Sequence, residues 1–329
     1  MDSEAGVDSI VETEKEQGML GLLFSGQGAQ YVGMGRALQD ASQAARGLFA
    51  RADEVLGYSL SSICWEGPES ELVRTEHCQP GIYVVSLAAW AALCERCPSL
   101  DAPGVVAAAA GLSLGEYSAL AAAGGFTFED GLRLVHTRGR LMQEACSASD
   151  GAMASVLGME VEALSPLCSE HGVGIANLNC PGQVVVSGER SRVDRLVEAL
   201  KAQGIRVIPL QVAGAYHSPL MAPAAEQLGD ALERTPMQAE LRFPVFANVN
   251  AQAHSGPEEI RDLLKAQVVG SVRWEESMRA MLALGVTTFV ELGPGKVLTG
   301  LMRRIDRGVK VVRVEDMGTL EDAAAQLTG

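Results

Sequence analysis

The chain has 329 residues, of which 47% are apolar and 20% are charged, proportions that are typical of a globular protein. Its net charge of −15 argues against nucleic acid or an anionic lipid surface as the main partner. No segment approaches the roughly 20 consecutive apolar residues of a membrane span. We therefore expect no nucleic-acid or membrane partner and a cytoplasmic location, with one large domain or two smaller ones.

The first 17 residues form an acidic stretch without apolar periodicity. We expect residues 1–17 to be a disordered, solvated tail. The seven cysteines are odd in number and follow no pattern, which indicates reduced thiols. Cys94 and Cys97 form an isolated C-x-x-C, and because no second ligand pair is evident we expect no metal and no bound cofactor.

The first part of the chain alternates between apolar runs and helical patterns. A short buried strand at 21–24 ends in a glycine-rich loop at 25–30. A helix is expected to begin near Met34. Further elements are expected in this order: helices at 42–56 and 80–95, a strand from 105, and an amphipathic helix within 126–145.

The composition changes after about residue 148. Short strands at 153–157, 175–178, 184–187 and 207–210 alternate with helices near 160–170 and 190–203, which gives the order β-α-β-β-α-β. The larger pattern then resumes with a helix at 219–234, strands at 245–248 and 288–291, and a final helix opened by Gly293-Pro294-Gly295.

These elements predict an α/β fold. The core, residues 18–148 and 213–329, would be hydrolase-like, with a short parallel sheet and a nucleophile elbow. An inserted ferredoxin-like α+β subdomain would occupy residues 149–212. A cleft would separate the two units.

The most informative segment is Gly111–Gly115, with the sequence GLSLG. It follows an apolar run and precedes a helix-forming run at 116–123, which is the context of a nucleophile elbow. The glycines permit a sharp turn, and the serine stands at a helix N-terminus, where free N–H groups stabilise developing negative charge. The pattern predicts Ser113 as a nucleophile, and a plain glycine-rich turn is the alternative.

A nucleophilic serine needs a base, which must come from the five histidines His77, His136, His171, His217 and His254. We favour His217 because Gly214–Pro219 lies where the chain returns from the predicted insert to the core and can face the elbow. His136 lies within a predicted helix beside Arg138, whose charge disfavours an imidazolium.

Several segments together resemble the malonyl-CoA:acyl carrier protein transacylase family, over residues 20 to about 316. The matching segments are Phe24-Ser-Gly-Gln-Gly-Ala-Gln30, Gly111-Leu-Ser-Leu-Gly-Glu116, Arg138-Gly139 followed by Met142-Gln143, Asn179-Cys-Pro-Gly-Gln183, His217-Ser-Pro-Leu-Met221, Gln267 with Val272-Arg-Trp274, and Gly293-Pro-Gly-Lys296. Each segment alone is weakly specific, whereas seven in this order identify the chain as similar to the family.

The resemblance implies a role for each matching residue. Ser113 would accept the acyl group, and His217 would take its proton and later return it to the leaving thiol. A backbone carbonyl supplied by Gln267 would orient the imidazole in place of a buried aspartate. The backbone N–H groups of Leu114 and Gln27 would form the oxyanion hole.

Two further residues would select the substrate. The resemblance implies that Arg138 binds the free carboxylate of the malonyl group with its forked guanidinium, although a mid-helix arginine could also lie on a solvated face. Tyr216 is a bulky neighbour of the base and should crowd an α-methyl branch. It would therefore favour malonyl over methylmalonyl groups by roughly 1–3 kcal/mol, the worth of one methyl in a pocket.

Three positions depart from the family pattern. Leu112 stands where the family usually has His, so a supporting hydrogen bond is in doubt, and we expect Leu112 to pack beneath the elbow. Ser271 replaces the usual Pro, so the loop that carries Gln267 is expected to be looser. Ser25 stands where Pro is frequent, which we expect to matter little.

The resemblance implies an [acyl-carrier-protein] S-malonyltransferase of fatty acid biosynthesis. Malonyl-CoA would acylate Ser113, and the phosphopantetheine thiol of acyl carrier protein would take the malonyl group in a second step. One alternative is a freestanding acyltransferase that loads polyketide synthase carrier domains. Others are a serine hydrolase or thioesterase, which would need an acid such as Asp150 or Asp194, and a non-catalytic module that binds carrier protein.

The expected partners are malonyl-CoA and acyl carrier protein, and we expect a monomer. Acyl carrier proteins are acidic, so this acidic chain would need a local basic surface to bind one. The candidate residues, which could equally form a solvated helix end, are Arg303, Arg304, Arg307 and Lys310.

Overall fold

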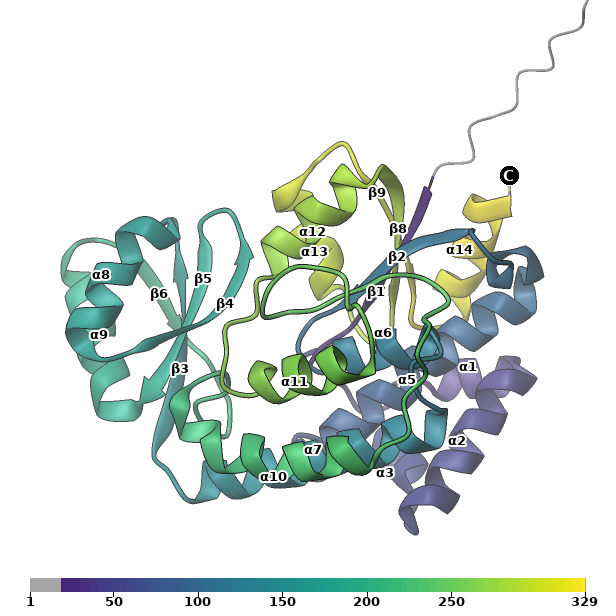
Figure 1. The fold of residues 1–329 in the computed structure, drawn as a ribbon, viewed down its shortest axis with the longest axis horizontal. Helices are drawn as coiled ribbons and strands as arrows, with labels where there is room; N and C mark the ends of the chain where they lie inside the picture. The colour runs from purple at the N-terminus through teal and green to yellow at the C-terminus, as the bar shows by residue number, and fades with distance from the viewer. Residues whose placement is uncertain (1–18, 329) are drawn as a thin grey trace, which may run out of the picture.

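The computed structural model describes residues 19–328, and the predicted acidic tail, residues 1–17, lies outside them. The chain forms a mixed α/β fold with one parallel and one antiparallel sheet (Figure 1). Within the described residues, no helix is long and apolar enough to cross a membrane.

The larger sheet is parallel and has the strand order β7-β2-β1-β8-β9. Its strands are β1 (Met19–Phe24), β2 (Val106–Gly111), β7 (Val245–Phe246), β8 (Val286–Leu292) and β9 (Lys310–Val314). Leu20 to Phe24 are all buried, because helices cover both faces of such a sheet and its central strand is apolar throughout. The predicted short parallel sheet is thus present.

Helices surround this sheet, and α5 is enclosed by others on nearly every side. Its apolar residues are distributed all round the helix axis, as expected for a helix without a solvent face. The α-helices outside the smaller sheet are α1 (Arg36–Ala41), α2 (Gln43–Leu56), α3 (Leu60–Glu66), α4 (Glu69–Leu72), α5 (Thr75–Arg96), α6 (Gly115–Ala122), α7 (Phe128–Ser147), α10 (Ala222–Arg234), α11 (Pro257–Gln267), α12 (Trp274–Ala283), α13 (Val297–Ile305) and α14 (Met317–Thr328). Two 3₁₀ turns accompany them, η1 (Pro98–Asp101) and η2 (Pro219–Met221).

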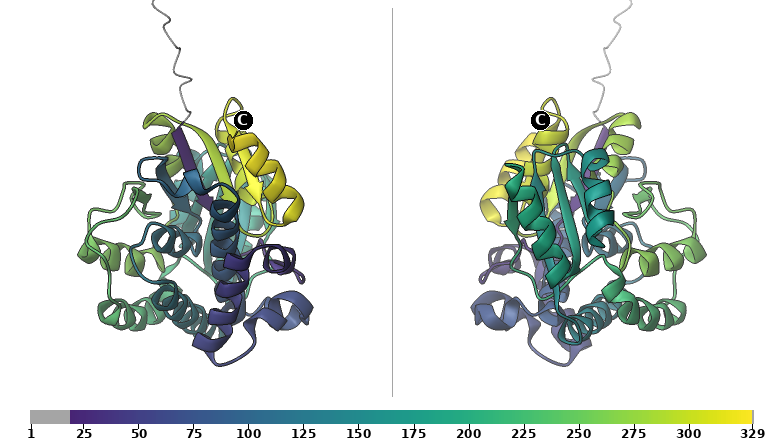
Figure 2. Two further views of the ribbon diagram at one scale, coloured as in Figure 1. Left: turned by 90° about the vertical axis from the view of Figure 1, so that its right-hand side faces the viewer. Right: turned by 90° about the vertical axis from the view of Figure 1, so that its left-hand side faces the viewer.

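The smaller sheet is antiparallel and has the strand order β4-β5-β3-β6. In chain order it comprises β3 (Gly151–Leu157), α8 (Val161–His171), β4 (Gly174–Cys180), β5 (Gln183–Glu189), α9 (Arg190–Ala202) and β6 (Arg206–Pro209). Both helices cover the face that points away from the larger sheet (Figure 2). The edge strand β4 lies beside α12 and α13, which connects the two parts of the molecule.

The prediction for the end of the chain was wrong. Helix α13 follows Gly293-Pro294-Gly295 as expected, but it is not the final element, since β9 and α14 come after it. Strand β9 has only five residues and lies at the sheet edge, where pairing with β8 decides its conformation. A short strand of this kind has little local signal, because the stabilising contacts come from residues distant in sequence.

Candidate active site

Ser113 lies in the turn between β2 and α6, with a backbone φ of 51°. Positive φ is unfavourable for a residue with a Cβ atom, so the surrounding structure must hold it. A Cβ atom on Gly111 would lie 1.9 Å from the backbone of Gly115, and one on Gly115 would lie 2.1 Å from the carbonyl oxygen of Phe24. Both glycines are therefore needed for the turn to fold back against β1.

The glycine-rich loop after β1 lies directly against this turn. A Cβ atom on Gly26 would lie 2.4 Å from the backbone oxygen of Leu112, so only glycine allows this approach. The next residue is Gln27, whose side chain contacts the hydroxyl of Tyr216 and the amide of Gln79. Gln27 therefore follows a residue whose backbone lies against the turn, and Leu114 is the residue just before α6.

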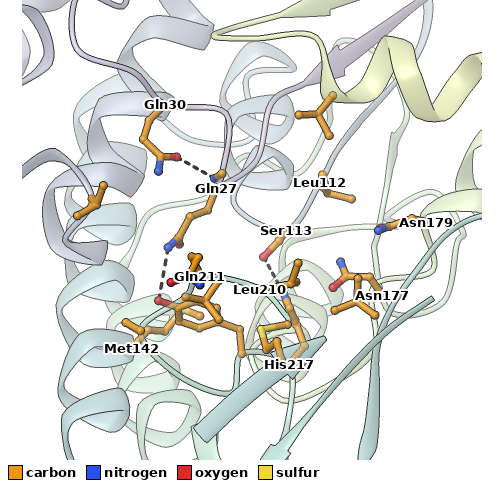
Figure 3. A pocket seen from close by; sticks show the side chains of 18 of the residues that line it. Gln27, Gln30, Leu112, Ser113, Met142, Asn177, Asn179, Leu210, Gln211 and His217 are labelled. Atoms are coloured by element: carbon orange, nitrogen blue, oxygen red, sulfur yellow. Dashed lines mark hydrogen bonds between the residues drawn. The ribbon is translucent and has the colours of Figure 1, made fainter. Parts of the chain in front are cut away.

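His217 also has a positive φ, of 56°, and its side chain is buried against Ser113. Its Nε2 atom lies 2.9 Å from Ser113 Oγ (Figure 3). Its Nδ1 atom faces two carbonyl oxygens, that of Gln267 at 2.8 Å and that of Gly270 at 3.2 Å. Because carbonyls only accept hydrogen bonds, Nδ1 carries the proton and Nε2 is free to accept the one on Ser113 Oγ.

The surroundings keep His217 neutral. Burial lowers the pKa of its imidazole to about 4, and the positive charge of Arg138 acts in the same direction. The two backbone carbonyls at Nδ1 oppose this shift, since they stabilise the imidazolium. At neutral pH the residue is an uncharged acceptor, the form that a general base requires.

Arg138 lies in the middle of α7 with only 1% of its surface exposed. Its Nη1 atom donates to Gln79 Oε1 over 2.7 Å, and its Nη2 atom donates to Ser113 Oγ over 2.9 Å and to Gln267 Oε1 over 3.0 Å. Burial lowers the pKa of the guanidinium, which nevertheless stays protonated at neutral pH. Among the described residues, no carboxylate forms a salt bridge with it, so the site holds a cation that can accept an anionic ligand.

A buried polar network supports these residues from behind. The Nε2 atom of Gln267 donates to the backbone oxygen of Ser113 over 2.9 Å and to Glu116 Oε2 over 2.8 Å. Glu116 Oε1 lies 3.0 Å from His254 Nε2, and the side chains of this pair are 1% and 0% exposed. The carboxylate of Glu116 thus fixes the amide that contacts both Ser113 and Arg138.

Asn248 completes the network on the elbow itself. Its Oδ1 atom accepts the backbone N–H of Ser113 over 2.6 Å, and its Nδ2 atom donates to the carbonyl oxygen of Gly111 over 2.8 Å. Sequence reasoning missed Asn248 and Gln79, and it considered His254 only as a candidate base. Glu116 was quoted as part of the motif without a role, and its charge within an otherwise buried helix could have marked it.

Ser113, Arg138 and His217 line a cavity of about 620 Å³ between the two sheets. Figure 3 shows Gln27 and Gln30 on one side of Ser113 and Asn177 and Asn179, from β4, on the other. The polar lining residues are Gln27, Gln30, Ser113, Arg138, Asn177, Asn179, Gln211, Tyr216 and His217. The cavity has the size and the mixed lining of a small-molecule site, with Ser113 accessible from it.

The described residues contain no group of three His, Cys, Asp or Glu side chains placed to hold a metal ion. All seven cysteines are free, including Cys94 and Cys97.

Comparison with known proteins now identifies the family. Residues 22–321 match the family described as acyl transferase domain. A malonyl CoA-acyl carrier protein transacylase of Bacillus subtilis (strain 168) is 43% identical over 314 residues, which cover 94% of this chain and 97% of that protein. The chain belongs to the malonyl-CoA:acyl carrier protein transacylase family.

Solved structures of transacylases have the same fold. The crystal structure of acyl-carrier-protein-S-malonyltransferase from Bartonella henselae has a TM-score of 0.89 and 38% identity, covering 94% of this chain and 100% of that one. A malonyl-transacylase in complex with its type II PKS acyl-carrier protein has a TM-score of 0.87, also at 38% identity, covering 94% and 99%. The prediction of the family from sequence is confirmed.

The three departures from the transacylase pattern have structural counterparts. Leu112 is half-buried: it packs against a buried apolar cluster, as expected, and it also contributes an apolar wall to the cavity. Ser25 Oγ donates to the carbonyl oxygen of Pro294 over 3.1 Å. Ser271 Oγ donates to the carbonyl oxygen of Ile175 in β4, a bond that proline could not form.

Proposed function

We propose that this protein transfers the malonyl group from malonyl-CoA to the phosphopantetheine thiol of acyl carrier protein, for fatty acid biosynthesis. The observation that carries the proposal is the pair of contacts at Ser113 Oγ, which lies 2.9 Å from His217 Nε2 and 2.9 Å from Arg138 Nη2. A nucleophile, a neutral acceptor for its proton and a buried cation for the substrate carboxylate thus meet at one atom.

The reaction would proceed in two half-reactions. In the first, Ser113 Oγ attacks the thioester carbonyl carbon while its proton moves to His217 Nε2. The carbon–sulfur bond then breaks, and the imidazolium returns the proton to the sulfur of CoA. In the second, the thiol of the carrier protein gives its proton to His217 and attacks the malonyl ester, and Ser113 Oγ leaves with that proton.

Backbone donors would stabilise the oxyanion in both half-reactions. We assign this role to the N–H groups of Leu114, at the start of α6, and of Gln27, in the loop that Gly26 holds against the elbow. The carbonyl of Gln267 would keep the proton of His217 on Nδ1, and its amide side chain would hold Arg138. Removal of one such oxyanion donor typically costs about 2.7–4 kcal/mol of transition-state stabilisation.

Arg138 would bind the malonyl carboxylate. In the free protein its Nη2 atom is occupied by Ser113 Oγ, so the carboxylate would take over this donor when substrate enters. The phenol ring of Tyr216 lines the same cavity, and its hydroxyl is held by Thr75 over 2.7 Å. A fixed ring at this place supports the predicted preference for malonyl over methylmalonyl groups.

A serine hydrolase of the triad type is less well supported. Such an enzyme places a carboxylate at the second nitrogen of the histidine, whereas Nδ1 of His217 faces two backbone carbonyls. Asp150, one of the two acids considered from sequence, pairs with Arg190 at the surface. A transacylase that loads polyketide carrier domains would use the same chemistry at Ser113, and the identity of the carrier distinguishes it.

The proposal also includes the division of the chain into two units, its location and oligomeric state, and the surface that binds the carrier protein. We describe residues 18–148 and 213–329 as a hydrolase-like core and residues 149–212 as a ferredoxin-like insert, which the element order β3-α8-β4-β5-α9-β6 supports. We expect a cytoplasmic monomer without a bound cofactor, nucleic acid or membrane. An acidic carrier protein would bind the exposed residues Arg303, Arg304, Arg307 and Lys310.

Intact-protein mass spectrometry tests the proposal. The protein is mixed in turn with malonyl-CoA, acetyl-CoA and methylmalonyl-CoA, and then with holo acyl carrier protein. We expect a malonyl adduct on the wild type, its transfer to the carrier, and no adduct on Ser113→Ala. An adduct of malonyl mass on folded Ser113→Ala would contradict the assignment of the nucleophile, and bulk hydrolysis without carrier would favour a hydrolase.

A further inference from the structure

The strand β4 forms a second contact besides its own sheet. The backbone N–H of Leu178 donates to the carbonyl of Val272 over 2.9 Å, and the N–H of Val272 donates to the carbonyl of Ala176 over 2.8 Å. Asn177 and Val272 form a parallel bridge between these two bonds. The segment after α11 is thereby paired like a short additional strand with the edge of the smaller sheet.

Ser271 adds a third bond to this pairing. Its Oγ atom donates to the carbonyl oxygen of Ile175 over 2.5 Å, from a half-buried position. The residue just before it is Gly270, whose carbonyl oxygen lies 3.2 Å from His217 Nδ1, and the other acceptor at Nδ1 is the carbonyl of Gln267 at 2.8 Å. The Ser271 hydroxyl is thus anchored one residue away from a carbonyl that orients the imidazole.

We infer that Ser271 is a positioning residue, whose hydroxyl holds the Gln267–Gly270 carbonyls in place for His217 by tying them to β4. This inference rests on the proposed function, in which His217 is the base. The loop would shift without the tie, and the imidazole would follow its acceptors away from the 2.9 Å contact with Ser113 Oγ. A small misplacement of a catalytic group lowers the rate of the chemical step more than it weakens substrate binding.

The same strand links this tie to the substrate. Asn177 and Asn179 of β4 line the cavity, while Ile175 and Ala176 bond to Ser271 and Val272. One strand therefore contacts both the space for the acyl donor and the loop behind the base. The absence of the usual proline led us to expect a looser loop at Ser271. In its place, the hydrogen bond of the hydroxyl restrains the backbone that a proline ring would restrain.

A pair of nearly isosteric variants isolates the hydroxyl. Ser271→Thr keeps the donor, whereas Ser271→Val has almost the same shape without it. We expect Ser271→Val to lower kcat for acylation by malonyl-CoA by roughly 3–10-fold, the usual weight of one neutral hydrogen bond. We expect its KM to change less than twofold and Ser271→Thr to remain within about twofold of the wild type.

The control is Ser149→Ala, which removes another hydrogen bond from a hydroxyl to a carbonyl. Ser149 Oγ donates to the carbonyl oxygen of Ala145 over 2.8 Å, close to the junction of the two units but without contact to the His217 loop. Its kcat should match the wild type. Thermal unfolding of each variant is measured alongside, and rates are compared at a temperature where all are folded.

Three results would overturn the inference, and the first two are an unchanged kcat in Ser271→Val and an equal loss in Ser271→Thr and Ser271→Val. A change confined to KM would do the same, because it would place Ser271 in substrate binding. If the wild type itself forms no acyl adduct, the proposed function fails, and this outcome is separate from any difference among the variants. Should Ser271→Val not fold, Ser271→Ala takes its place in the same comparison with Ser271→Thr.

Discussion

Arg138 donates a hydrogen bond to the Oγ atom of Ser113 over 2.9 Å, although Arg138 lies in α7 and Ser113 lies in the turn between β2 and α6. A malonyl group carries its carboxylate only one methylene away from the thioester carbonyl. A cation beside the attacking oxygen therefore matches this short spacing, whereas the carboxylate of a longer diacid would extend past it. On the proposed function, the distance between the two residues would itself be a basis for selecting the substrate.

Replacement of Arg138 by Ala should separate carboxylate binding from thioester chemistry. A hydrogen bond to a charged group contributes about 1.5–3 kcal/mol, so transfer from malonyl-CoA should fall by roughly 10–10³-fold once the unpaired substrate charge is included. Acetyl-CoA has no carboxylate, and its use should hold steady or rise. The measurement is the ratio of malonyl to acetyl adduct formed by each variant.

Two variants serve as controls for this ratio. Arg138→Lys keeps the charge but loses the fork, so it should restore malonyl transfer only in part. Arg140→Ala, on the same helix but exposed and paired with Glu144, should behave as the wild type. An equal loss with both substrates in Arg138→Ala would mean that Arg138 acts on the structure and not on the choice of substrate.

The pKa of His217 predicts an unusual pH profile. The folded pKa of about 4 lies below the ordinary value of 6.5, so the imidazole stays neutral, and competent as a base, down to about pH 4–5. We expect kcat/KM with malonyl-CoA to change little between pH 7 and pH 5. An unperturbed histidine would cause a fall of roughly 25-fold over the same range.

The depressed pKa of His217 also makes the folded state less stable at low pH. Because the folded pKa of His217 is depressed, its contribution to stability is complete above the unfolded pKa of 6.5 and is lost as the pH falls through about 4.

His217→Ala should slow both half-reactions by roughly 10²–10⁴-fold at every pH. His136→Ala is the matched control, and a larger loss there than in His217→Ala would show that the base is misassigned.

Glu116 should be needed for stability, because it satisfies several buried donors at once. In Glu116→Ala the side-chain N–H of Gln267, the backbone N–H of Asn248 and the imidazole of His254 all lose a partner. We expect the free energy of unfolding to fall by about 3 kcal/mol, measured by denaturant titration. The exposed Glu144→Ala should stay within about 0.5 kcal/mol of the wild type, and a similar value for Glu116→Ala would contradict this account.

The backbone at Ser113 predicts a reversal of the usual order of alanine and glycine. At a φ of 51° a Cβ atom is strained, and Ser113→Gly relieves this strain whereas Ser113→Ala retains it. The glycine variant should therefore be about 1 kcal/mol more stable than the alanine variant, with both inactive. Thermal unfolding of the two proteins under identical conditions measures the difference, and a more stable alanine variant would show that the turn holds no strain.

Local sequence patterns were enough to predict part of this site. Ser113 could be predicted because the residues next to it determine its turn: an apolar strand, two glycines and a helix. His217 was favoured because it lies where the chain returns from the predicted insert to the core. The role of Arg138 came instead from resemblance, since nothing local distinguishes it from an arginine on a solvated helix face. Its 1% exposure depends on packing between α7 and the rest of the fold.

Contacts between distant residues could not be predicted in this way. The pair of Glu116 and His254 joins positions 138 residues apart, and each residue alone suggests a surface side chain. The bond from Ser271 to Ile175 is likewise invisible in sequence, where the absence of a proline suggested only a looser loop. Strand β9 was missed because its partner β8, and not its own sequence, determines its conformation.

The position of β1 at the centre of the parallel sheet constrains how the chain acquires its structure. Strand β1 is the first described element to leave the ribosome, yet it pairs with β8, whose residues are made only after those of β2 to β7. Until then one edge of an apolar strand has no partner, and closing so long a loop is entropically unfavourable. The sheet that carries Ser113 is therefore completed only after β8 has been made, and the open edge of β1 favours aggregation before that point.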